Sequence, residues 1–153
     1  MSILSLDIAT RATGFAVFDN GELITSGVIK SSKSDFIERG REIAQELREI
    51  FVKHSVTDLV IEDLKVAKNQ KVTVMIAIVH GIIIATLSKD CSVYYISPTE
   101  WRAGFNHGLN AKRELAKKRA IQLTEVMYGL KVSDDEAEAI LLGKFFEKNK
   151  VLG

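Results

Sequence analysis

The sequence predicts one α/β domain over residues 1–153, built as a mixed five-stranded sheet flanked by helices. Residues 1–30 hold short apolar segments broken by Asn20-Gly21, and helical spacing of apolar residues begins only after Ser34. Beyond that point helical and strand-like segments alternate, as they do in α/β domains. A chain of 153 residues with 46% hydrophobic and 27% charged residues suits a single globular core.

Three consecutive strands are expected at the start of the chain. "SILSLDI" (2–8) is a short apolar segment, and "GFAVFD" (14–19) and "ELITSGVI" (22–29) flank Asn20-Gly21. An Asn-Gly pair between two such segments is a strong signal for a β-hairpin. The three strands are therefore predicted to be antiparallel neighbours.

The middle of the chain alternates between the two periodicities. Apolar residues from Phe36 to Phe51 recur at helical spacing, with Ser34 as the predicted N-cap. "DLVIED" (58–63) is the next predicted strand. The apolar segment from about 70 to 88 is interrupted by a histidine and a glycine, and we expect it to be a buried core helix.

The last third begins with "SVYYIS" (92–97), a fifth strand candidate. "SPTE" (97–100) has Ser at the N-cap, Pro at N1 and Glu at N3, which predicts a short capped helix. Trp101 within that helix is expected to be a core anchor. Two further helices are predicted over about 111–127 and 133–149.

Composition excludes several classes of protein. The single cysteine, Cys91, excludes an internal disulfide framework and a multi-cysteine zinc site. The N-terminus lacks the pattern of a secretory signal. The most apolar segment, 72–87, is shorter than the ~20 residues that a membrane span needs. We therefore expect a cytoplasmic protein without a membrane partner.

Acidic residues stand where the predicted elements are otherwise apolar. Asp7 lies inside the first strand, Glu62 follows "LVI" at the end of the fourth, and "SDDEAEAILLG" (133–143) begins the last helix. A buried carboxylate is costly unless it is paired, hydrogen-bonded or bound to a cation. Asp7 is thus either a structural residue held by backbone donors or a cation ligand, and its position leaves both open.

The acids of the last helix also allow two explanations. Ser133 and Glu136 can form a capping box, and each acid in a first turn is favoured by the helix dipole by about 0.3–1 kcal/mol. Asp135 and Glu138, however, stand three apart on one face and can point towards the sheet. Asp134 is expected to face water.

The carboxylates on the strands and the last helix can together hold a pair of hard divalent cations, since oxygen ligands suit Mg²⁺ or Mn²⁺. Two such ions about 3.5–4 Å apart activate water and stabilise the leaving oxygen in phosphodiester hydrolysis. If the strands of Asp7 and Glu62 are neighbours, their side chains converge at one end of the sheet. The candidate ligands are Asp7, Glu62, Asp135 and Glu138.

Three segments, in this order, resemble the motifs of the RuvC-type Holliday-junction resolvases within the RNase H-like nucleases. "LDIATRATGFAVFD" (6–19) resembles the first motif, an Asp on strand one followed by a Thr-Gly turn. "VIEDLKVAKNQKVTVMIAIVHG" (60–81) resembles the second, and "SDDEAEAILLG" (133–143) the third. The short length and "SPTEWR" (97–102) are most similar to the small phage-encoded branch.

The resemblance implies an RNase H-like fold and a structure-selective, divalent-metal-dependent endonuclease. Such an enzyme resolves four-way DNA junctions, and related branches such as forks, by paired symmetric nicks. It implies a homodimer, and a bacterial host cell as the location if the chain is phage-encoded. Asp7 and Glu62 match the first two metal ligands and Asp135 and Glu138 the last-helix pair. Mg²⁺ is the implied cofactor, with Mn²⁺ as a substitute.

The chain departs from the family pattern at three places. Glu138 stands where an Asp is usual, and Ile8-Ala9 replaces the Pro-Gly that often follows the first Asp. Lys65 occupies the position at which bacterial members carry an aromatic residue thought to act at the junction centre. The fourth ligand, the first turn and the opening of the junction are therefore expected to differ from those relatives.

A basic segment, "KRELAKKR" (112–119), holds five cations and one acid. With Asn110 as the predicted N-cap, Lys112 and Arg113 lie in the first helical turn, where cations oppose the helix dipole but a phosphate would be attracted. A solvated helix face is the alternative interpretation. Beside an acidic metal site, contact with the DNA backbone is predicted for Lys65, Lys68, Lys71, Arg102, Lys112, Arg113, Lys117 and Lys118.

Two other functions fit the same residues. An RNase H-like nuclease acting on structured RNA would use the same carboxylates. A non-catalytic module that binds branched DNA would use the acids only to cap a helix. A sugar-kinase-like ATPase shares the Asp-then-turn opening but normally needs two such domains, for which 153 residues are too few.

Overall fold

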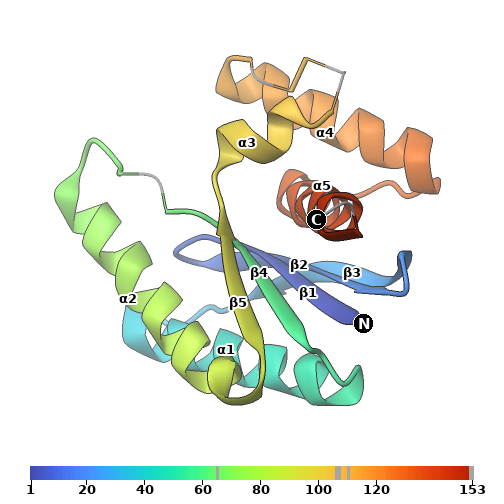
Figure 1. Cartoon of the computed structure of the whole chain (residues 1–153). Coiled ribbons are helices and arrows are strands. Elements are labelled where there is room, and N and C mark those ends of the chain that lie inside the picture. Colours follow the sequence, from blue (N-terminus) through green and yellow to red (C-terminus); the bar gives the residue numbers. More distant parts are fainter. Residues whose placement is uncertain (65, 106–107, 110, 152–153) are drawn as a thin grey trace.

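A computed structural model describes residues 1–64, 66–105, 108–109 and 111–151 as a five-stranded sheet with helices on both faces (Figure 1). The strands are β1 Ser2–Ile8, β2 Ala12–Asp19, β3 Glu22–Lys30, β4 Asp58–Glu62 and β5 Ser92–Ile96. The helices are α1 Phe36–Lys53, α2 Gln70–Leu87, α3 Pro98–Ala103, α4 Arg113–Tyr128 and α5 Asp134–Val151, with a 3-10 turn η1 at Ser88–Asp90. The predicted α/β class is confirmed.

The sheet has the strand order β3-β2-β1-β4-β5. The first three strands pair antiparallel, as predicted, while β1 and β4 and then β4 and β5 run parallel. Asn20 and Gly21 close the hairpin with φ of 49° and 86°, in the left-handed region that this pair of residues tolerates well. The antiparallel hairpin thus leads into a parallel half in which β1 and β4 end at the same edge.

Side chains of β1 alternate between two cores. Leu4 and Leu6 pack with α1 and α2 on one face, whereas Ile3 packs with α4 and α5 on the other. Figure 1 shows α1 and α2 on one side of the sheet and α5 on the other, with α3 and α4 beyond it. The same alternation directs Ser5 and Asp7 towards α5. The face that receives Asp7 is therefore determined by the period of the strand.

Two predicted helix starts differ from the structure. The N-cap of α1 is Asp35, whose carboxylate accepts the Glu38 N–H at 3.0 Å, so the prediction of Ser34 is wrong. A carboxylate forms a stronger, charge-assisted cap at that position. α4 begins at Arg113 with Lys112 as its N-cap and no side-chain cap bond. Asn110, the predicted cap, lies outside the described residues.

α2 differs from the predicted buried core helix. It packs on α1, where Ile82 lies against Gly40, and it buries Val79, but Val74 is 56% and Ile78 37% exposed. In the described part of the chain it is the one helix long and apolar enough to cross a membrane, with 22% of that 18-residue window buried. One or two such helices are weak evidence for a span. Its exposed apolar face remains without a partner among the described residues.

Candidate active site

Asp7 lies near the end of β1, opposite Gly14 of β2. Thr13-Gly14, expected as a turn, lies inside a strand because β2 already begins at Ala12. Gly14 is required by a close approach, since a Cβ added there would lie 2.1 Å from the backbone oxygen of Asp135. The glycine therefore allows the first turn of α5 to rest on the strand directly beside Asp7.

Small residues hold α5 on the sheet. Ser5 Oγ donates a hydrogen bond to the Ala139 carbonyl at 2.6 Å, in a buried position. A Cβ added at Gly143 would lie 2.6 Å from the same hydroxyl and 2.6 Å from the Phe18 ring, so the glycine lets α5 pack closely on the sheet. This short separation determines how far Asp135 and Glu138 reach towards the end of β1.

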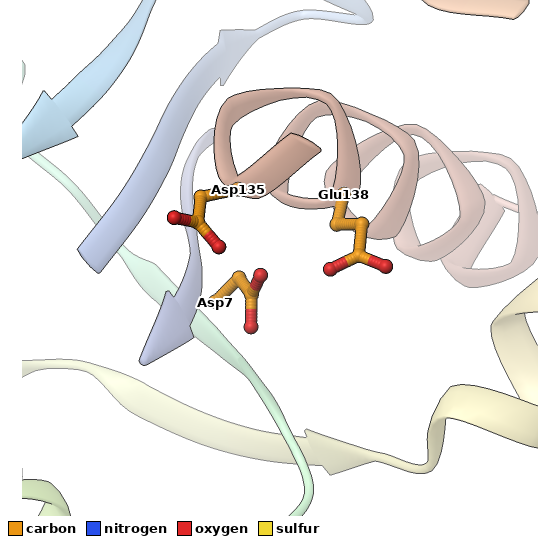
Figure 2. A group of neighbouring side chains, drawn as sticks. All are labelled: Asp7, Asp135 and Glu138. Atoms are coloured by element: carbon orange, nitrogen blue, oxygen red, sulfur yellow. The ribbon is translucent and has the colours of Figure 1, made fainter. Parts of the chain in front are cut away.

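The carboxylates of Asp7, Asp135 and Glu138 converge (Figure 2), and each offers an oxygen within 4.8 Å of the others. Burial, followed by the charges of Glu62 and Glu138, raises the pKa of Asp7 well above its usual value. Burial and the charges of Asp134 and Glu138 raise the pKa of Asp135. Neighbouring carboxylates that oppose one another's ionisation form a site that a divalent cation would neutralise.

Glu62, the last residue of β4, borders the group from the neighbouring strand. Asp7 and Glu62 each lie one residue beyond the Leu6–Ile61 pair of the parallel ladder. The Glu62 charge contributes to the raised pKa of Asp7, yet the close group found among the described residues does not include Glu62. Trp101 Nε1–H donates to Glu62 Oε2 at 2.8 Å. The structure thus brings three candidate ligands together and holds the fourth at their edge.

All four acids line one cleft of about 610 Å³. Its walls come from the ends of β1 and β4, from α2 and from the start of α5. Basic side chains of α3 and α4 line the same cleft, namely Arg102, Arg113 and Lys117. A concave site with acids at its floor and cations at its border suits a phosphate-bearing substrate that also needs a metal ion.

Two of these cations pair with acids of α5. Arg102 Nη2 lies 2.8 Å from Glu138 Oε1, and Lys117 Nζ lies 2.6 Å from Asp134 Oδ2. Arg113 is exposed on the first turn of α4. The other predicted DNA contacts in the described residues are exposed and do not line the cleft: Lys68, Lys71, Lys112 and Lys118. Lys65, with its predicted replacement of an aromatic wedge, lies outside the described residues.

The first turn of α5 corrects two expectations. Asp134 does not simply face water, because the hydrogen bond from Lys117 lowers the pKa of Asp134 against the effect of burial. The predicted capping box is only half formed. Ser133 Oγ accepts the Glu136 N–H at a long 3.5 Å, while Glu136 Oε1 accepts the Ser26 hydroxyl at 2.8 Å. Glu136 therefore joins α5 to β3.

Sequence reasoning missed the contact between Trp101 and Glu62. The prediction that Trp101 is a core anchor is confirmed, since its side chain is fully buried, but the indole N–H also reaches a candidate metal ligand. A partial signal was present: a buried tryptophan needs an acceptor, and Trp101 follows a strongly capped turn beside the strand of Glu62.

Comparison with known families gives a match over most of the chain. The family model described as "Crossover junction endodeoxyribonuclease RuvC" matches residues 3–141. The RuvC protein of Nitrosomonas eutropha is 27% identical over 143 residues, which cover 90% of this chain and 79% of that protein. RuvC of Rhodopirellula baltica is 29% identical over 159 residues, and the match covers 97% of this chain and 89% of the Rhodopirellula protein.

Solved structures agree on the fold. Thermus thermophilus RuvC in complex with a Holliday junction substrate superimposes with a TM-score of 0.82 at 15% identity, covering 100% of this chain and 96% of that one. The yeast mitochondrial Holliday junction resolvase Ydc2 gives a TM-score of 0.65 at 13% identity, covering 97% and 78%. At such low identity the likeness supports the arrangement of sheet and helices.

Proposed function

The chain belongs to the RuvC family of crossover junction endodeoxyribonucleases, and we propose that it resolves four-way DNA junctions by metal-dependent phosphodiester hydrolysis. One observation carries the proposal to particular residues: carboxylates from β1 and α5 converge in a cleft that is bordered by basic side chains. The whole of residues 1–153 would act as one nuclease domain. Its DNA substrate implies action in the cytoplasm, that of a bacterial host if a phage encodes the chain.

The proposed metal ligands are Asp7, Glu62, Asp135 and Glu138. Their fit to a divalent ion rests on the raised pKa of Asp7, caused by burial and by neighbouring carboxylates, which marks excess negative charge in a partly buried site. Carboxylate oxygens are hard donors, so Mg²⁺ is the expected ion, with Mn²⁺ as a substitute. When bound, such ions supply activation of water and stabilisation of the charge on the leaving 3′ oxygen.

The protein's own contribution is positioning. Arg113, exposed at the border of the cleft, is proposed to hold a backbone phosphate next to the acids. Arg102 pairs with Glu138 and Lys117 pairs with Asp134, and this pairing keeps both cations beside the cleft. A phosphate arriving in the cleft offers each cation a competing anionic partner. Lys68, Lys71, Lys112 and Lys118 would extend the contact along the flanking DNA.

A homodimer is the proposed assembly, because two sites related by a twofold axis can nick opposed strands symmetrically. The exposed apolar face of α2 supports this part of the proposal. Its exposed residues recur at helical spacing and several are small, which permits close helix–helix contact: Val74, Ala77, Ile78, Gly81 and Ala85. A continuous apolar face of this kind is better suited to contact with a second copy of the chain than to exposure to water.

The test is a cleavage assay on a synthetic four-way junction with Mg²⁺ or Mn²⁺, comparing the natural chain with Asp7→Asn. The natural chain is expected to give paired symmetric nicks. Asp7→Asn should bind the junction but lose cleavage by at least about 10³-fold, a barrier increase of ~4 kcal/mol. Full cleavage by this variant would remove Asp7 from the proposed ligands.

Two further arms of the assay test the rival functions. Structured RNA in the same buffer should remain uncut, and faster cleavage of RNA than of the junction would favour an RNA nuclease. An intact junction after long incubation of the natural chain with Mn²⁺ would favour a module that binds branched DNA without cutting it.

A further inference from the structure

Consecutive residues of α3 contact two different acids of the cleft. Trp101 Nε1–H donates to Glu62 Oε2 at 2.8 Å, and Arg102 Nη2 pairs with Glu138 Oε1 at 2.8 Å. We propose that Trp101 is a positioning residue, which orients the Glu62 carboxylate for a divalent ion. This inference rests on the proposed function, since it assumes that Glu62 is a metal ligand.

The local sequence explains how Trp101 reaches Glu62. Glu62 pairs with Ile96 at the end of the parallel β4–β5 ladder. The chain then turns at once: Ser97 caps α3 by accepting the Glu100 N–H at 3.1 Å, and proline occupies the first turn. A turn held at both its cap and its first residue has few alternative conformations. It therefore returns the Trp101 side chain to the strand end that carries Glu62.

Packing fixes the indole in place. Trp101 is 0% exposed, and its ring meets Phe105 edge-on with centroids 6.4 Å apart. The Arg102 guanidinium lies 5.2 Å from the centroid of the same ring on the cleft side. An indole N–H can donate but cannot accept, so the contact sets the direction of Glu62 Oε2. A donor that cannot rotate defines the orientation of its acceptor.

The position of Glu62 beside the other acids links this hydrogen bond to metal binding. Among the described residues Glu62 lies outside the close group of Asp7, Asp135 and Glu138, and its Oε2 accepts the Trp101 indole N–H at 2.8 Å. Partners that orient a metal ligand typically change metal affinity or activity by about 10- to 100-fold when removed. A purely structural tryptophan would instead change only the stability of the fold.

The experiment measures Mn²⁺ affinity by calorimetry on the whole chain, alongside cleavage kinetics. Trp101→Phe keeps an aromatic ring but removes the donor. We expect Mn²⁺ binding to weaken by about 10- to 100-fold and kcat to fall by a similar factor, with KM for the junction within about twofold. Phe105→Leu is the matched control, because it disturbs the same aromatic packing and leaves the indole N–H intact. It should lower thermal stability while Mn²⁺ affinity stays within about twofold.

A second variant covers the case in which Trp101→Phe does not fold. Because the chain has a single tryptophan, an analogue with sulfur in place of the indole N–H can be introduced at this one position. It preserves the shape of the ring and should weaken Mn²⁺ binding as Trp101→Phe does. Unchanged Mn²⁺ affinity in a folded variant that lacks the donor would overturn the proposal.

Glu62→Gln and fluorescence complete the test. In a Glu62→Gln background, loss of the donor should cause no further loss of Mn²⁺ affinity, whereas an undiminished effect would overturn the link to Glu62. Trp101 is the one tryptophan of the chain, so emission excited selectively at the indole should shift as Mg²⁺ is titrated into the natural chain. A constant spectrum at saturation would also contradict the proposal. If metal binds with these dependences but the junction stays intact, the proposed function fails while the positioning role stands.

Discussion

Gly14 and Asp135 touch through their backbones at the point where α5 begins, and no side-chain atom fits between them. The contact joins the second strand to the acidic helix beside Asp7, which pairs with Gly14 in the sheet. The distance between the β1 and α5 carboxylates thus depends on a position that bears no functional group.

Gly14→Ala should therefore impair the site without removing an acid. The added Cβ would lie 2.1 Å from the Asp135 oxygen, so the start of α5 must shift, at a cost of about 1–3 kcal/mol in the free energy of unfolding. Mn²⁺ binding and junction cleavage should fall at least about tenfold. Ser26→Ala is the control, because it loosens the same turn through Glu136 and should leave metal affinity unchanged. Normal activity in a folded Gly14→Ala protein would contradict this account.

Arg113→Ala tests the basic border of the cleft. Loss of one phosphate contact should weaken junction binding and reduce the slope of log K against log salt by about 0.9. Binding can be measured in the Asp7→Asn background so that the junction stays intact. Lys53→Ala, an exposed lysine on the opposite face of the sheet, should leave the slope unchanged. Equal salt slopes for Arg113→Ala, for Lys53→Ala and for the protein without either change would indicate that Arg113 does not contact a DNA phosphate.

Val74→Glu tests the exposed face of α2. A carboxylate in an apolar contact between two copies should convert the dimer to a monomer and reduce paired nicking, while the fold is retained. Light scattering reports the mass, and thermal melting checks the fold. Val52→Glu on α1 introduces the same charge at a valine that is 62% exposed and should remain dimeric. A Val74→Glu dimer would indicate that another surface mediates assembly.

The ion pair between Asp58 and Lys150 should make the free energy of unfolding depend on pH. Burial works to raise the pKa of Asp58, but hydrogen bonds from Lys150 and Thr57 outweigh it, so the net pKa is lowered. Because the folded pKa lies below the unfolded one, the pair stabilises the protein above about pH 4 and loses its effect as pH falls through the folded pKa. Asp58→Asn should lower the free energy of unfolding at pH 7 by about 1–3 kcal/mol, with a smaller difference in acid.

Denaturant unfolding between pH 3 and 7 measures this difference. Asp58 begins β4 and Glu62 ends it, so the folded variant should still cleave junctions at neutral pH. Asp19→Asn is the control, since Asp19 is 48% exposed and its pairing with the N-terminus at 3.7 Å should contribute little. A stability difference that grows in acid would contradict the assigned sign.

Much of the fold could be predicted because its signals are local. The Asn20-Gly21 hairpin, the five strands and the capped start of α3 each follow from a few adjacent residues. Side-chain alternation along β1 then directs Asp7 towards the helix that carries the other acids. The approach of Asp7 to Asp135 and Glu138 could thus be predicted from the sequence once the order of the strands is given.

The remainder depended on contacts between distant segments. The burial of α2 was overestimated because its hydrophobicity gives no information on which face a neighbour covers. The pairing of Arg102 with Glu138 and of Lys117 with Asp134 joins residues on different helices, and sequence spacing cannot predict such pairs. The contact of Trp101 with Glu62 could not be predicted from the sequence, because it depends on how the chain turns back towards β4 after β5.

The hydroxyl of Ser5, buried under α5, has a consequence for how the enzyme loses its activity on heating or in denaturant. Freeing the start of α5 from the sheet would break the Ser5–Ala139 hydrogen bond and expose the adjoining core. Amide protons in the buried middle of this helix, from Ala139 to Leu142, should therefore exchange with solvent only through global unfolding, among the slowest in the chain. The clustered carboxylates of Asp7, Asp135 and Glu138 would then disperse together with the fold, in a single cooperative step.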